Sequence, residues 1–284
     1  MSIGARLAGP TVPFNATAHA ADTEETTGHL DGVRATARIR ATYNGRVTTL
    51  PELRSDGPFH LRRMRTGGRG ATVGIIGAMS APLGGDRLAL DITAEDRAEL
   101  EVTTAAATLA LRGPTTAPAT YDVRLTVGEG ASLRWLPQPL ISAAGSNLQQ
   151  TYTVGLAATS RLLLREEQLL GRANEQPGHL VSRIRVHHAG RALLDQHTAY
   201  GAPEPGWDGP AVLGGHRAVG QLLIVDPKMD VGRDPVLLRE GTNDGCAVLA
   251  PLAGGPALLA TAVAPTSSAL RELLDEALAH ALGA

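Results

Sequence analysis

Residues 87–93 read RLALDIT, and in this stretch apolar and polar side chains alternate with a period of two. The same alternation returns in residues 98–103 (AELEVT) and 121–127 (YDVRLTV). A period of two is typical of β-strands with one buried face, because successive side chains point to opposite sides of a sheet. The pattern therefore predicts several half-buried strands, and it extends from Arg87 to Val186.

Glycine-rich turns separate the predicted strands. Gly84, Gly85 and Asp86 precede the first of them, and further turn signals lie at residues 113–114 and 128–130. Strands at such short intervals favour a mainly β fold of the sandwich, barrel or layered type. Nothing in this region suggests alternating β and α units.

A helical period appears only near the C-terminus. From Ser268 onward, leucine and alanine side chains recur on one helical face, which predicts a C-terminal helix with Ser268 as its N-cap. Gly283 is the expected stop signal. A second, weaker helix is expected over residues 215–223. We expect one domain over residues 1–284, with residues 1–15 loosely held.

Composition excludes several classes of function. The net charge of −2 gives no general attraction to nucleic acid or to an anionic membrane. Cys246 is the single cysteine, so the chain has no intramolecular disulfide and no CxxC metal site. Lys228 is the single lysine and does not stand in a GxxxxGK[ST] nucleotide-binding loop. We therefore expect a cytoplasmic protein that binds neither nucleic acid nor membranes.

Two acidic positions are candidates for a structural or a functional role. Asp86 closes the glycine turn directly before a strand, where a carboxylate often bonds its own backbone. Glu166 and Glu167 follow an apolar run, so at least one of them is expected to point inward. A buried carboxylate needs a partner, and Arg172 is an obvious candidate.

Standard catalytic and metal-binding motifs are missing from the sequence. It contains no HExxH, no GxSxG and no GxGxxG after a strand. His187 and His188 are adjacent, and neighbouring strand residues point to opposite faces, so they are weak candidates for ligands of one metal ion.

Several short blocks in the right order resemble the UreD (UreH) family of urease accessory proteins. These blocks are APLGGDRL (81–88), VTTAAAT (102–108), which contains Thr103, LPQPLI (136–141), and the stretch from Glu166 to Arg172. Each block is weak alone, and their order and spacing carry the resemblance. It covers about residues 47–201.

The resemblance implies a mostly β fold with strands in helical layers and a few helices. It also implies a non-enzymatic scaffold that helps to deliver nickel to apo-urease, together with a helical UreF-like protein and a UreG-like GTPase. Nickel would then be a transient ligand, with no permanently bound cofactor. Asp86 and Glu166 become nickel-path or structural carboxylates, supported by Gly84, Gly85, Thr103 and Arg172.

Two other functions stay open from the residues alone. A hydrolase could use Asp86 and Glu166 as a carboxylate pair, and the separation of the two carboxyls would decide this. A β-type module that binds carbohydrate or protein without a metal is the other alternative.

Overall fold

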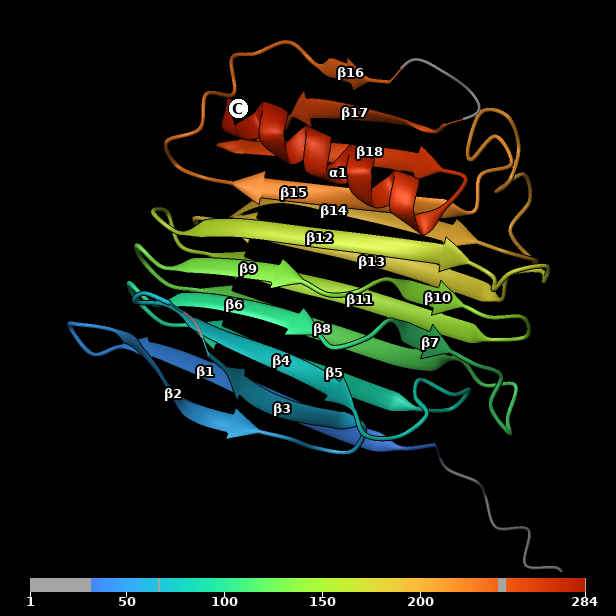
Figure 1. Cartoon of the computed structure of the whole chain (residues 1–284), viewed down its shortest axis with the longest axis horizontal. Coiled ribbons are helices and arrows are strands. Elements are labelled where there is room, and N and C mark those ends of the chain that lie inside the picture. Colours follow the sequence, from blue (N-terminus) through green and yellow to red (C-terminus); the bar gives the residue numbers. More distant parts are fainter. Residues whose placement is uncertain (1–31, 66, 240–243, 284) are drawn as a thin grey trace, which may run out of the picture.

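The computed structural model describes residues 32–65, 67–239 and 244–283. Residues 1–15, predicted to be loosely held, lie outside the described residues. The protein is mainly β and consists of two large facing sheets with one helix near the C-terminus (Figure 1). The predicted fold class, many short strands in layers with a C-terminal helix, is confirmed.

The two sheets differ in size. Sheet A has seven strands, in the spatial order β14 (Arg191–Tyr200), β13 (His179–His188), β11 (Asn147–Leu156), β8 (Ala119–Val127), β5 (Arg87–Ala94), β1 (Arg34–Tyr43) and β2 (Thr48–Arg54). Sheet B has eleven, of which nine follow in the order β16 (Val236–Leu238), β17 (Cys246–Pro251), β18 (Ala257–Ala264), β15 (Ala218–Val225), β12 (Arg161–Leu170), β9 (Ser132–Leu136), β6 (Glu99–Thr104), β4 (Ala71–Gly77) and β3 (Phe59–Met64). The short strands β7 (Thr108–Ala110) and β10 (Leu140–Ser142) pair beside β12.

The middle of the chain winds between the sheets as a helix of strands. From β4 to β13 it alternates between sheet B and sheet A, apart from the short β7 and β10. Each turn adds one strand to each sheet, so the neighbours β5, β8, β11 and β13 are parallel, as are β4, β6, β9 and β12. This winding requires one buried face per strand, which explains the period of two.

The main core fills the space between the two sheets. It is built mostly from aliphatic side chains, with Trp135 and Tyr152 as its largest fully buried members. Their rings meet edge to face with centroids 6.4 Å apart. Side chains from both sheets therefore interlock around this aromatic pair.

The C-terminal helix α1 (Ser267–Leu282) covers part of the outer face of sheet B. Its apolar face packs against β15, β17 and β18 through Leu270, Leu273 and Leu274. Gly283, at φ 75°, ends the helix as predicted. The N-cap is Thr266, whose side chain accepts a hydrogen bond from the backbone of Ala269, so the predicted cap at Ser268 is wrong by two residues.

The helix expected over residues 215–223 is also wrong, because β15 occupies most of this segment. Every residue of β15 is buried. Val219 and Leu223 belong to the core between the sheets, whereas Ala218 and Leu222 pack under α1. A strand that is covered on both faces shows no alternation of apolar and polar residues. Periodicity in the sequence therefore does not identify β15 as a strand.

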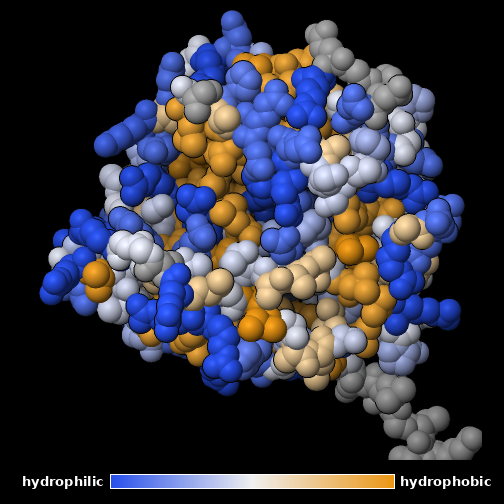
Figure 2. Space-filling view, in the orientation of Figure 1, coloured by the Kyte–Doolittle hydropathy of each residue, from blue (hydrophilic) through white to orange (hydrophobic). Residues whose placement is uncertain are grey.

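Polar side chains form a blue band over α1 in the space-filling view, with hydrophobic areas on each side of it (Figure 2). None of the helices in the described residues is long and apolar enough to cross a membrane.

Candidate functional site

Strand β12 carries two adjacent buried carboxyls. Glu166 and Glu167 are each only 3% exposed. Even-numbered residues of β12 face sheet A, and odd-numbered residues face α1, so the two side chains lie on opposite sides of sheet B. As expected, one of them, Glu166, points into the core, and Glu167 is buried on the opposite face under α1.

Glu166 is hydrogen-bonded from both sheets. Its Oε1 accepts from Ser182 Oγ on β13 at 2.6 Å and from Gln168 Nε2 at 2.8 Å. Its Oε2 accepts from Gln221 Nε2 on β15 at 3.4 Å. Three neutral donors thus converge on one carboxyl in the core.

Burial raises the pKa of Glu166 to about 7. The cause is desolvation, because removal from water penalises the charged form. The hydrogen bonds from Ser182 and Gln168 act in the opposite direction and limit the rise of the pKa. Near neutral pH this carboxyl therefore gains or loses a proton easily.

A small cavity lies beside Glu166. Its volume is about 20 Å³, enough for one water molecule or an ion of similar size. Oxygen-bearing side chains line much of it, including Glu166, Thr104, Gln150 and Tyr152. Gln150 donates to Tyr152 Oη at 3.0 Å, but its own Oε1 is buried without a hydrogen-bond partner among the described residues. The cavity thus combines an ionisable carboxyl with an amide oxygen free to accept or to ligate.

Glu167 is held by arginines. Arg271 of α1 approaches its two carboxylate oxygens at 3.3 and 3.1 Å, and Arg165 lies 3.5 Å away. Arg165 also contacts Asp275 of α1. The Glu167 side chain is fully shielded from solvent. These contacts join α1 to sheet B, a role that the sequence did not reveal.

Asp86 fixes the turn before β5. Its Oδ1 accepts from the backbone N–H of Val33 at 2.8 Å, and its Oδ2 accepts from that of Leu83 at 2.8 Å. Gly85 has a φ of 96°, in the region that favours glycine, and a Cβ on Gly84 would lie 2.8 Å from the carbonyl oxygen of Thr115. This geometry matches the structural role considered for Asp86.

The expected pair between Arg172 and Glu166 is wrong. Arg172 lies in the turn after β12 and donates to Glu175 through Nε and Nη2, each at 2.9 Å. Hydrogen bonds from Arg172 lower the pKa of Glu175 to about 2. Gly171 has a φ of 89° and redirects the chain between the two positions. Neutral side chains provide the hydrogen bonds to Glu166 instead.

The remaining candidates lie away from the cavity. Thr103 donates to the carbonyl oxygen of Leu136 at 2.8 Å, which ties β6 to β9. His187 is exposed, and Nε2 of His188 lies 3.2 Å from the carbonyl oxygen of Ala158. In the described parts of the chain, no group of three or more His, Cys, Asp or Glu residues is arranged to hold a metal ion.

The predicted carboxylate pair receives no support from this geometry. Asp86 is bound to backbone at the start of β5 in sheet A, whereas Glu166 lies in the middle of β12 in sheet B. Asp86 does not line the cavity beside Glu166.

Fold and site together define a wound, two-sheet β scaffold with the buried carboxyl of Glu166 beside a small cavity in its core. The model of the family described as UreD urease accessory protein matches residues 33–283. The chain is 64% identical over 248 residues to urease accessory protein UreD 2 of Saccharopolyspora erythraea, which covers 87% of each chain. It is 56% identical over 255 residues to urease accessory protein UreD 3 of Streptomyces griseus subsp. griseus, covering 88% of this chain and 97% of that one.

The chain therefore belongs to the UreD family of urease accessory proteins. Its role lies in the maturation of urease.

Proposed function

We propose that the protein is a non-enzymatic scaffold and metallochaperone that delivers nickel to apo-urease. It acts in the cytoplasm with a helical UreF-like protein and a UreG-like GTPase. We assign GTP hydrolysis to a separate protein, because Lys228, the one lysine of this chain, lies outside any nucleotide-binding loop motif. The family membership supports the role in maturation, and the interior site supports the part played by the metal.

The observation that carries the proposal is the Glu166 carboxyl beside an oxygen-lined cavity in the core. Nickel accepts carboxylate and imidazole ligands. A ligand must lose its proton before it binds a metal, and Glu166, with a pKa near 7, exchanges a proton readily at physiological pH. Glu167 also lines the cavity but is paired with arginines, so Glu166 with its neutral neighbours offers a divalent ion only a weak site. The site therefore suits transient passage of nickel, with no permanently bound cofactor.

Glu166→Gln tests this role, because the amide keeps the volume and removes the charge. We expect the variant to fold and to co-purify with its UreF-like and UreG-like partners, while urease activity and nickel content in cells fall. Asp86→Asn is the matched comparison, because Asp86 is equally buried but bound to backbone. For Asp86→Asn, we expect any loss of urease activation to follow loss of assembly.

Full urease activation by an assembled Glu166→Gln complex would contradict the proposal. So would a loss of activation that arises only because the complex no longer forms.

A further inference from the structure

Sheet B is interrupted beside Glu166 and Glu167. Strand β9 pairs with β12 as far as Leu164, and β10 resumes the pairing only at Gln168. Residues 137–139 (PQP) connect the two short strands, and prolines have no N–H to donate. In the described structure, this edge of β12 therefore has no strand ladder over residues 165–167.

The cavity of Glu166 crosses this interruption. On the core side it is lined by Tyr121 of β8 and Tyr152 of β11, which belong to sheet A. On the other side it is lined by Gln138 of the connecting segment and by Glu167, which faces α1. Residues of sheet A, of β12 and of the connecting segment thus meet around one small cavity.

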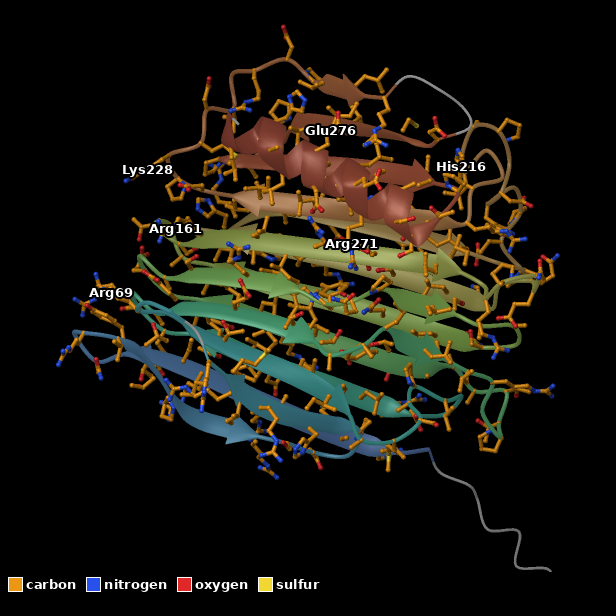
Figure 3. The ribbon with its side chains drawn as sticks, in the orientation of Figure 1. Arg69, Arg161, His216, Lys228, Arg271 and Glu276 are labelled. Atoms are coloured by element: carbon orange, nitrogen blue, oxygen red, sulfur yellow. The ribbon has the colours of Figure 1, made fainter. Side chains whose placement is uncertain are left out.

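Arg271 contacts two of the residues that line the cavity, Gln138 and Glu167. It extends from α1 toward β12 (Figure 3) and donates to Gln138 Oε1 and to Glu167 Oε2, each at 3.1 Å. Its guanidinium therefore bridges the two sides of the interruption. The side chain is 39% exposed, so Arg271 is in contact with water while it bridges its two acceptors.

We propose that the interruption in sheet B is a lateral opening to the Glu166 cavity, and that Arg271 closes it. When Arg271 leaves, Glu167 keeps only Arg165 as a cationic neighbour and its Oε2 becomes available at the mouth, next to Glu166 inside. A divalent cation and the guanidinium then compete for the same oxygens of Glu167. The buried, unpaired Oε1 of Gln150 is a further oxygen ligand inside the cavity. The nature of the cargo rests on the proposed function, but the opening itself does not.

Mercuric ion is a suitable probe, because it is a small divalent cation that binds thiolate rapidly. Gln150→Cys places a thiol in the cavity, and Cys246→Ser removes the native one. The rate at which the mercury–thiolate bond forms is followed by ultraviolet absorbance in the full chain. We expect Arg271→Ala to raise this rate by roughly tenfold or more, as loss of hydrogen bonds to a charged group suggests.

Glu276→Gln is the matched control. Glu276 also anchors α1, through Arg239 at 3.1 Å, but it does not contact the mouth (Figure 3). Its substitution should leave the rate unchanged. If Arg271→Ala does not fold, Arg271→Gln and Gln138→Ala open the same bridge with less disturbance.

An unchanged rate in folded variants of Arg271 and Gln138 would overturn the proposal. An equal acceleration by Glu276→Gln would also overturn it, because general loosening of α1 would then explain the entry. The mercury experiment measures entry into the cavity without urease or nickel. The Glu166→Gln experiment measures urease activation and does not depend on where the cavity opens. The two proposals can therefore fail separately.

Discussion

Glu166 and Glu167 are consecutive in the chain and equally buried, yet their carboxyls lie on opposite sides of sheet B. Glu166 receives hydrogen bonds from neutral side chains in the core, whereas Glu167 is paired with arginines under α1. Because successive side chains of a β-strand point to opposite faces, one glutamate is surrounded by neutral groups and the next by positive charges. Substitutions at the two positions should therefore have different consequences.

Glu166 should make the stability of the protein fall as the pH rises from about 4.5 to 7. In this range the unfolded chain releases the proton, while the folded protein retains it because burial has raised the pKa from 4.5 to about 7. Stability is lost wherever the unfolded state binds fewer protons. The total loss is roughly 3 kcal/mol, at about 1.4 kcal/mol per pKa unit.

Chemical denaturation of the parent and of Glu166→Gln at several pH values measures this effect, since other titrating groups cancel in the difference. The stability of the variant relative to that of the parent should increase steadily up to about pH 7 and stay constant above it. A difference in stability that does not change with pH would mean that Glu166 titrates in its ordinary range.

Glu167→Gln should destabilise the protein at neutral pH. The substitution leaves Arg165, whose side chain is only 12% exposed, without the carboxylate beside it, and weakens the attachment of Arg271. Loss of one partner from a largely buried ion pair costs about 2–4 kcal/mol. Urea denaturation at neutral pH measures the cost. Equal stability of the variant and the parent would show that the arginines are well solvated without Glu167.

The strands of the wound region could be predicted because each buries one face. In β5 and β8, apolar and polar residues alternate along almost the whole strand. The C-terminal helix was equally visible, since its leucines recur on one face above sheet B. The strand β15 was missed because both of its faces are covered, so its apolar run carries no period.

The site could be predicted only in part. The position of Glu166 after an apolar run correctly indicated burial. Two of its three hydrogen-bond donors, Ser182 and Gln221, are distant in sequence and meet Glu166 only through the packing of β13 and β15. Arg172 was close in sequence, but the turn at Gly171 directs it to Glu175. Nearness along the chain is a poor guide where a strand ends in a turn.

Arg172→Ala tests whether Arg172 pairs with Glu175 and not with Glu166. Arg172 is 55% exposed, and its pair with Glu175 lies in a surface turn, so we expect little or no loss of stability. The pH dependence assigned to Glu166 should remain as in the parent, because Arg172 does not contact that carboxyl. Denaturation curves across the same pH range measure both quantities. A shift in the titration of Glu166 would restore Arg172 as its partner.

Gly113→Ala should be among the most damaging single substitutions in the turn region next to Asp86. Gly113 packs against Gly84 so closely that a Cβ would lie 2.3 Å from the Gly84 nitrogen and 2.4 Å from its carbonyl oxygen. Both atoms are backbone, so neither can rotate away. The turn that Asp86 fixes must then move, which should cost about 3 kcal/mol or more.

Gly155→Ala on β11 is the matched control for this last prediction, because a Cβ there meets no atom within 4 Å. The same added methyl group should leave stability unchanged or raise it by up to about 1 kcal/mol, since alanine loses less conformational freedom on folding than glycine does. Thermal and urea unfolding of the two variants compare these effects directly. If Gly113→Ala is as stable as Gly155→Ala, the contact between Gly84 and Gly113 does not hold the Asp86 turn in place.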